Sequence, residues 1–331
     1  LVVLGYVFFG GVRSAVWANT FQTLVFMVMG VVTFTLIANA LGGPREAARL
    51  VLEYAPGHTV REGNVPHGMF LSYFFIPLSV GMFPHVFQHW LTARSARSFK
   101  LTVIAHPICI AIVWVPCILI GIWAAALVAK GDLTIGNPNA TLGTMVATLI
   151  DNPLLTGLLT AGILAAIMSS LDSQFVCLGT LFTNDVVKRL AGPDHFTDHQ
   201  LMWIGRAFVA LIVLVSYALA MALIKSSIFE LGVWCFTGFS GLFPLVFAAT
   251  YWRRATKTGA LLSVAAAASV WAVFFTQDII IDIPTKGPFL VGGVVPAAWV
   301  FLAGAIGMVA GSLFTAAPDA KAVDRFFPQS R

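Results

Sequence analysis

Residues 154–182 read LLTGLLTAGILAAIMSSLDSQFVCLGTLF, a long apolar run that is interrupted near its middle by three serines and one carboxylate. As a helix rising 1.5 Å per residue, the run would extend about 43 Å, which exceeds the roughly 30 Å hydrocarbon core of a bilayer. A carboxylate near the bilayer centre is costly, so it usually faces a protein interior, a water-filled cavity or an ion. The run therefore predicts a transmembrane helix that carries a polar site at Ser169, Ser170, Asp172 and Ser173.

The composition of the whole chain is that of an integral membrane protein. Hydrophobic residues make up 59% of the 331 residues and charged residues only 10%, whereas soluble domains carry roughly 25% charged residues. Apolar stretches of about 20 residues recur, and each is long enough to span a bilayer. We predict eight complete transmembrane helices at residues 21–41, 68–91, 101–128, 154–182, 203–224, 228–251, 260–281 and 291–314.

No segment between these helices is large enough to fold as a soluble domain, so we predict a single transmembrane domain over residues 1–331. The chain opens on the apolar residues 1–9 without an initiator Met. We expect these residues to be the end of an earlier, partial helix, and the sequence to be an N-terminally truncated fragment. Residues 316–331 are predicted to form a short polar tail.

The basic residues predict the orientation of the chain, because cytoplasmic loops are enriched in Lys and Arg. If the segment before residue 21 is cytoplasmic, 13 of the 19 Lys and Arg residues lie on the cytoplasmic side. We therefore predict a multi-pass protein of the plasma membrane with a cytoplasmic C terminus. The sequence contains no basic patch interleaved with aromatic residues, so we predict no nucleic-acid partner.

The polar site on residues 154–182 has ligand atoms that suit a small hard cation. On a helix Ser169, Asp172 and Ser173 share one face, and Ser170 stands at its edge. Hydroxyl, carbonyl and carboxylate oxygens suit sodium and are poor ligands for soft transition metals. Two alternatives stay open: the serines can bond to carbonyls of the preceding turn, and a buried Asp172 can hold a proton.

Three motifs resemble the sodium/solute symporter family, which includes proline, pantothenate, sugar and sialic acid symporters. The first is LAAIMSSLDSQ at residues 164–174 with TNDVVK at residues 183–188. The second is GGVR at residues 10–13 with AVWAN at residues 15–19 and Gln22. The third is Gly81 with Pro84, His85 and Gln88.

The resemblance implies an all-α polytopic protein with a LeuT-like core of two inverted five-helix repeats. The first complete helix would be the fifth core helix, the next five would form the second repeat, and the last two would be additional helices. The family's conserved sodium would be held by the Ala166 carbonyl, by the hydroxyls of Ser169 and Ser170, and by carbonyls of a first core helix that precedes this sequence.

Some members of the family bind a second sodium with two hydroxyls that map to Asp172 and Ser173 and with a carboxylate that maps to Asn19. This chain exchanges the two groups, because the amide stands at position 19 and the acid at position 172. We hypothesise that Asn19, Asp172 and Ser173 form either a second cation site or a hydrogen-bonded lock between two helices.

The same resemblance suggests where a solute would bind. His85 and Gln88 are three residues apart and share a helix face, and His85 lies near positions that line the substrate site in symporters of sugar type. Phe236 and Ser240 on residues 228–251 are further candidates for substrate lining. A purely structural role, as helix contacts, is an alternative for each of them.

We therefore predict a sodium-coupled symporter of a small organic solute that works by alternating access in a lipid bilayer. Sodium would be the coupling ion, and no other cofactor or metal is predicted. A different class also fits the sequence, namely the symporter-like membrane input module of a sensor histidine kinase. An enzyme is not predicted, because no paired catalytic motif appears.

Overall fold

A computed structural model describes residues 2–61, 65–91, 93, 95–192, 195–224, 226–281 and 288–327. It describes side chains at all of these positions except residues 2–15, 172, 322 and 325. The regular secondary structure of the described residues is helical, apart from one isolated bridge between Val291 and Val294. It divides into two compact units, one of Leu1–Arg61 with Gln88–Ile224 and one of Glu62–Phe87 with Lys225–Arg331.

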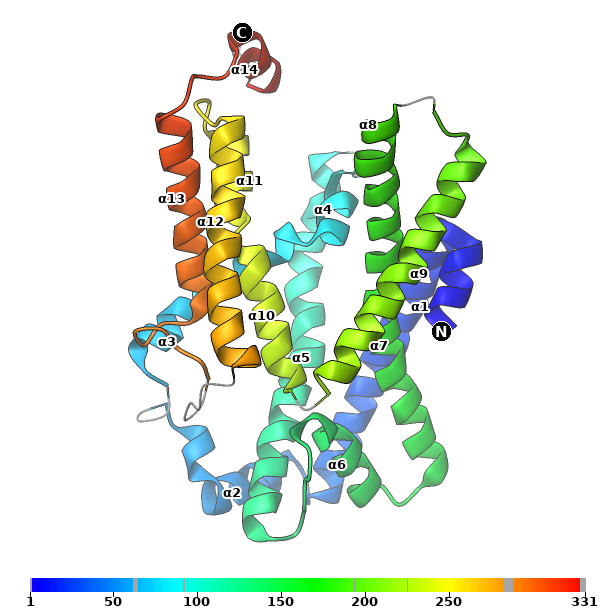
Figure 1. The fold of residues 1–331 in the computed structure, drawn as a ribbon. Coiled ribbons are helices and arrows are strands. Elements are labelled where there is room, and N and C mark those ends of the chain that lie inside the picture. Colours follow the sequence, from blue (N-terminus) through cyan, green and yellow to red (C-terminus); the bar gives the residue numbers. More distant parts are fainter. Residues whose placement is uncertain are drawn as a thin grey trace. The chain divides into compact units, whose positions relative to one another are not determined.

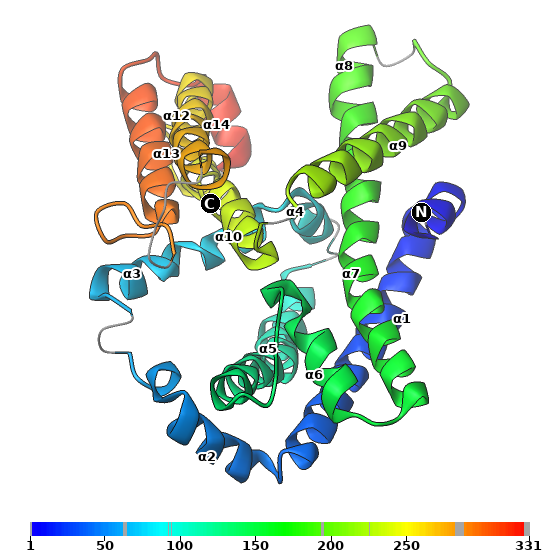
Figure 2. The same ribbon diagram turned by 60° about the horizontal axis from the view of Figure 1, so that its bottom comes forward.

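The first unit is built around α1 (Val2–Ala40) and α7 (Pro153–Leu181), which lie side by side in both Figure 1 and Figure 2. One end of this unit holds its main apolar core, in which Ile37, Met145 and Leu159 are fully buried. The unit also contains α2 (Pro44–Tyr54), α5 (Phe99–Lys130), α6 (Thr141–Leu149), a π-helix (Phe182–Val187), α8 (Lys188–Ala191) and α9 (Asp198–Ala222).

The second unit is dominated by the packing of α12 (Lys257–Phe275) against α13 (Pro296–Leu313). Small residues let the two helices approach closely: the Ser263 hydroxyl donates to the Gly304 carbonyl at 2.8 Å, and a Cβ on Gly307 would lie 2.7 Å from the Leu262 carbonyl oxygen. The unit also contains α3 (His67–Ser72), part of α4 (Pro84–Leu91), α10 (Ile228–Ser240), α11 (Phe243–Tyr251) and α14 (Ala320–Phe326).

Seven described helices are long and apolar enough to cross a membrane, or eight if one bent pair counts as a span. The predicted helix at residues 154–182 agrees with α7 to within one residue at each end. The start of α7 follows from its sequence, because the Asn152 side chain accepts from the Leu155 amide at 3.1 Å and Pro153 occupies the first turn, where its missing N–H costs nothing.

The predicted transmembrane helix over residues 68–91 is not continuous. The structure divides this stretch into α3, two 3₁₀ segments (Tyr73–Phe75 and Pro77–Met82) and α4, and the two parts of the stretch meet at an angle of 56°. Pro77 and Pro84 explain the division, because proline lacks an amide donor and its ring clashes with the preceding turn.

Two further boundaries differ from the prediction. Residues 2–9 belong to the same helix as residues 21–40, so the expected separate partial helix is wrong. The last transmembrane helix begins at Pro296 instead of residue 291. Gly292 and Gly293 turn the chain just before it with φ values of 61° and 75°, a conformation that favours glycine.

The predicted helix at residues 228–251 is one apolar span made of two helices. Its first helix, α10, ends at Ser240, and α11 begins at Phe243 with Pro244 in its first turn.

Candidate functional site

Asn19 joins α1 to α7 through hydrogen bonds to two serines. The Ser169 hydroxyl donates to Asn19 Oδ1 at 2.6 Å, and Asn19 Nδ2 donates to Ser173 Oγ at 3.1 Å. Ser169 and Ser173 are one turn apart on α7, so a single amide can reach both hydroxyls. Ser169 is only 8% exposed, and Asn19 and Ser173 are half-buried.

A fourth polar group completes this cluster on the side of α1. Thr23 lies one turn after Asn19, and its hydroxyl is 3.4 Å from Asn19 Oδ1. The side-chain oxygen Oδ1 of Asn19 thus accepts from two hydroxyls, while the side-chain nitrogen Nδ2 donates to a third. Because Ser169 uses its proton in this bond, both lone pairs of its oxygen stay available to a cation. The cluster therefore fixes the direction of a hydroxyl oxygen on α7.

Close backbone packing also holds α1 and α7 together about two to three turns away from the cluster. A Cβ on Gly162 would lie only 2.6 Å from the Cβ of Met29, so the helices meet here because the residue is glycine. Met29 follows Asn19 in α1, whereas Gly162 precedes Ser169 in α7, which means that the helices run antiparallel. Gly162 therefore permits the close approach of α1 to α7.

The remaining residues of the predicted cation sites lie on the same stretch of α7. Ala166 is half-buried and Ser170 is exposed. The Ser169 hydroxyl points to Asn19, which differs from the alternative in which it bonds to its own preceding turn. Asp172 belongs to α7, but its side chain lies outside the described residues.

The candidate substrate residues lie on α4 and α10. His85 and Gln88 are both half-buried on α4. In the second unit, the Phe83 ring lies 5.7 Å from the His85 ring and 5.4 Å from the Phe236 ring, measured between centroids. Ser240 is fully buried, and its hydroxyl donates to the Thr237 carbonyl of its own helix at 2.8 Å.

Sequence reasoning missed two of these contributors. Thr23 is four residues after Asn19, so helical spacing alone would have placed it on the same face. Phe83 connects His85 to Phe236, yet no pattern marks it, because aromatic residues are common throughout this chain. The structure also joins α10 to the end of the α12 span, where Trp234 Nε1 donates to Asp278 Oδ2 at 2.7 Å.

The model of the sodium:solute symporter family matches residues 1–266. The chain belongs to this family. The resemblance inferred from the three motifs is therefore confirmed.

Two curated relatives in the family transport proline according to their names. The chain is 26% identical over 337 residues to the sodium/proline symporter of Salmonella typhimurium, covering 97% of this chain and 62% of the relative. It is 24% identical over 330 residues to the high-affinity proline transporter PutP of Bacillus subtilis, covering 98% of this chain and 66% of the relative. The chain thus spans about two thirds or less of the length of these relatives, which are transporters and not enzymes.

A solved structure with the same fold is the substrate-bound, outward-open state of a sodium-coupled sialic acid symporter. The TM-score is 0.71 with 20% identity, and the match covers 96% of this chain and 66% of the other. The prediction of an all-helical membrane protein with a LeuT-like transporter core is confirmed. The apolar helices and the family together make this chain a multi-pass membrane protein.

Proposed function

We propose that the protein is a sodium-coupled symporter that takes up a small organic solute across the plasma membrane by alternating access. The observation that carries this proposal is the polar cluster between α1 and α7, in which a buried serine hydroxyl is oriented by Asn19. Membership of the sodium:solute symporter family supports sodium as the coupling ion. Proline is the first solute to test, because several relatives are proline symporters.

The proposed coupling site consists of the Ala166 carbonyl and the hydroxyls of Ser169 and Ser170. All three groups are oxygens, which a small hard cation prefers, and they lie within about one turn of α7. Sodium bound here would shift the population toward the conformation that binds solute. Asn19 would act as a positioning residue that fixes the direction of the Ser169 hydroxyl.

For Asn19, Asp172 and Ser173 we favour the helix lock over a second cation site. The Asn19 amide already takes part in three hydrogen bonds with Ser169, Ser173 and Thr23, so a cation would have to displace at least one of them. The decisive variant is Asp172→Asn. An unchanged sodium activation curve and transport Hill coefficient would support the lock, whereas a lower Hill coefficient would favour a second ion.

The solute would contact α4 and α10 through His85, Gln88 and Phe236. His85 and Phe236 both lie near the Phe83 ring, which supports an aromatic wall on this side of the solute. Ser240 is the weakest of the candidates, because its buried hydroxyl is already bonded within α10.

The proposal is tested by uptake into proteoliposomes that contain the full-length protein and an inward sodium gradient. The panel should include proline and other amino acids, sialic acid, monocarboxylates, vitamins and sugars, with a choline gradient as the reference. We expect sodium to stimulate the uptake of at least one of these solutes. Equal uptake in sodium and choline for every transported solute would refute the coupling.

Serine variants test the ligand assignment within the same assay. We expect Ser169→Ala and Ser170→Ala to raise the half-saturating sodium concentration about tenfold, the effect of losing roughly 1.4 kcal/mol of binding. Thr160→Ala is the matched control, because its exposed hydroxyl bonds only to the Thr156 carbonyl of the same helix. If Thr160→Ala raised the half-saturating sodium concentration as much, the two serines would have no special role in sodium binding.

The alternative of a kinase input module gains no support from these relatives, all of which are named as transporters. A kinase input would show ligand-dependent phosphorylation in the parent protein without net solute uptake.

A further inference from the structure

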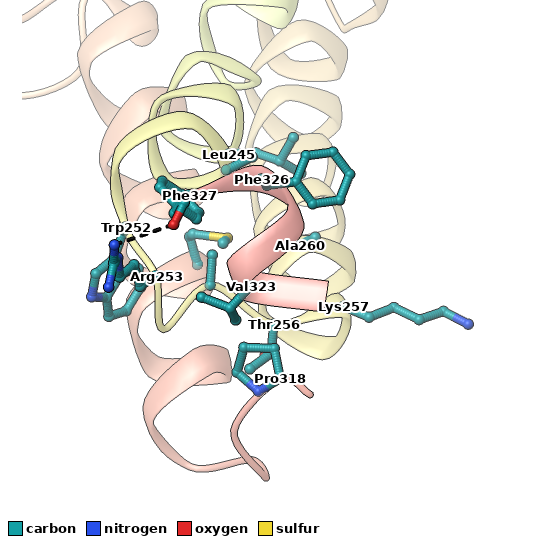
Figure 3. Close-up of a pocket in the computed structure, with 13 residues that line it drawn as sticks. Leu245, Trp252, Arg253, Thr256, Lys257, Ala260, Pro318, Val323, Phe326 and Phe327 are labelled. Atoms are coloured by element: carbon teal, nitrogen blue, oxygen red, sulfur yellow. Dashed lines mark hydrogen bonds between the residues drawn. The ribbon is translucent and has the colours of Figure 1, made fainter. Parts of the chain in front are cut away.

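A cavity of about 360 Å³ lies in the second unit, where α11 ends and α12 begins. Figure 3 shows it between these two helices and α14, with the last turn of α14 lying across it. Both helices belong to apolar spans, Ile228–Tyr251 and Lys257–Ile280. The turn between them, residues 252–256, therefore marks the end of two membrane crossings, and the cavity lies at a membrane–water interface.

The wall of the cavity is mostly apolar. Leu245 and Ala249 contribute from α11, Ala260 from α12, and Val323 and Phe326 from α14. The Phe326 side chain is 76% exposed, which is unfavourable in water but favourable beside lipid. A volume near 360 Å³ falls in the range of small-molecule sites, roughly 300–1,000 Å³.

The polar edge of the cavity is basic. Arg253 and Lys257 are its charged lining residues, both are exposed, and no acidic side chain lines it among the described residues. Arg253 Nη2 donates to the Phe327 carbonyl at 3.3 Å (Figure 3), which leaves most of the five guanidinium donors for another acceptor. Lys257 stands at the rim, and Figure 3 shows its side chain extending outward.

The nearby carboxylates do not neutralise this edge. Asp319 caps the start of α14, where it accepts from the Lys321 amide at 3.2 Å, and both Asp319 and Asp324 are exposed outside the cavity lining. Trp252 also lines the cavity, and tryptophan favours the headgroup level of a bilayer.

We propose that this cavity binds an anionic phospholipid, with the phosphate held by Arg253, assisted by Lys257 at the rim, and one acyl chain packed between α11, α12 and α14. An apolar wall beside a basic edge at the end of two spans matches an amphiphile whose head is negative. A free anion would leave the apolar wall uncovered, and a neutral lipid would leave Arg253 and Lys257 without a counter-charge. Basic pockets between membrane helices have this chemistry in general.

The experiment uses the full-length protein in phosphatidylcholine nanodiscs that contain a small fraction of phosphatidylglycerol with a photoreactive acyl chain. After illumination, we expect crosslinks on peptides that contain residues 245–260 and 318–327. Arg253→Gln should lower the yield about fivefold, the effect of one basic side chain near an anionic lipid surface, and the Arg253→Gln/Lys257→Gln double variant should lower it further. Arg97→Gln is the matched control, because it also removes an exposed positive charge, at the start of another span.

Three further arms test the two halves of the proposal separately. Arg253→Lys keeps the charge and should retain most of the crosslinking, which guards against a mere folding defect. Ala260→Phe fills the cavity while keeping both charges, and it should exclude the acyl chain. A phosphatidylcholine probe with the same acyl chain should crosslink weakly at these peptides. Equal labelling by that probe, an unchanged yield in Arg253→Gln or Ala260→Phe, or displacement of the probe by excess inorganic phosphate would each overturn the proposal.

Discussion

Asn19 is the residue on which the α1–α7 cluster depends, because its amide is the common partner of three hydroxyls. We predict that Asn19→Ala lowers the free energy of unfolding by about 1–2 kcal/mol, since Ser169 and Ser173 lose their partner in a partly buried setting. The measurement is unfolding in mixed micelles. Combining Asn19→Ala with Ser173→Ala should give a coupling energy of about 1 kcal/mol in a double-mutant cycle.

Thr20→Ala is the control for this prediction. Thr20 follows Asn19 in α1, but it is exposed and its hydroxyl bonds to the Val16 carbonyl of the same helix at 2.9 Å. We expect little change in this variant. If Thr20→Ala and Asn19→Ala destabilise the protein equally, the contact across the helices contributes nothing measurable.

The bond between Trp234 and Asp278 gives a second prediction for single residues. Trp234 is 4% exposed, and its indole donates to the Asp278 carboxylate at 2.7 Å. Asp278→Ala should destabilise the protein by about 1.5–3 kcal/mol, as expected for a hydrogen bond to a charged group. Asp278→Asn keeps an acceptor oxygen and should cost less. Unfolding measured with tryptophan emission tests the order, and an equal loss in both variants would contradict the stabilising effect expected of the retained acceptor oxygen.

The sequence predicts which residues carry the α7 cluster better than it predicts their partners. Helical spacing placed Ser169 and Ser173 on one face, but nothing in the spacing of residues 154–182 points to Asn19, which is 150 residues from Ser169. The family resemblance suggested grouping Asn19 with Asp172 and Ser173, and the bond between Asn19 and Ser169 was not predicted. Thr23 could have been placed beside Asn19 by helical spacing within α1. Phe83 could not, because contacts between helices depend on how the helices are rotated, and a single sequence does not encode rotation in any short pattern.

At the scale of helices, Gly162 controls the distance between α1 and α7. We predict that Gly162→Ala destabilises the protein by about 1–3 kcal/mol, the usual cost of overpacking, because the new Cβ would meet Met29 at 2.6 Å. The separation of the helices should also weaken the Ser169–Asn19 bond, so sodium activation should shift to higher concentration. Both changes are measured on the purified, reconstituted protein.

Gly157 on the same helix provides the matched control. A Cβ there would meet nothing within 4 Å, so Gly157→Ala should be neutral or stabilising by up to about 1 kcal/mol through helix propensity. Met29→Gly removes the Cβ that the new methyl group would meet at 2.6 Å, so it should relieve part of the loss in Gly162→Ala. Absence of this relief would mean that the glycine acts through something other than contact with Met29.

The helices themselves follow from the sequence where apolar length and capping agree, and fail where proline competes with them. For α7, the apolar run, Asn152 and Pro153 all indicate the same start, and the prediction holds to within one residue. Residues 68–91 are also mostly apolar, yet Pro77 and Pro84 divide them into short helical pieces. Hydropathy reports how favourably side chains transfer into lipid. It does not report whether each backbone amide has a hydrogen-bond partner.

For the whole molecule, the bent stretch decides the membrane topology. Among the described residues, six spans follow the bent pair (His67–Met82 with Pro84–Leu91) and precede the C-terminal segment. Five of them contain α5, α7, α9, α12 and α13, and the sixth is the broken span α10–α11. If the bent pair crosses the membrane, α2 and the C-terminal segment lie on opposite sides. If it does not cross, they lie on the same side.

We predict that the bent pair crosses, which places α2 outside and the C-terminal segment in the cytoplasm. The test introduces single cysteines into a variant that lacks Cys109, Cys117, Cys177 and Cys235, and labels them with an impermeant maleimide in vesicles of known orientation. Ala48→Cys on α2 should react from outside and Ala317→Cys from the cytoplasmic side.

Thr134→Cys, between α5 and α6, is the reference position. An odd number of spans separates it from the C-terminal segment in either topology, so it should react from outside. Labelling of Ala48→Cys from the same side as Ala317→Cys would show that the bent pair enters and leaves the membrane on one face. Arg45 and Arg49 of α2 would then be cytoplasmic.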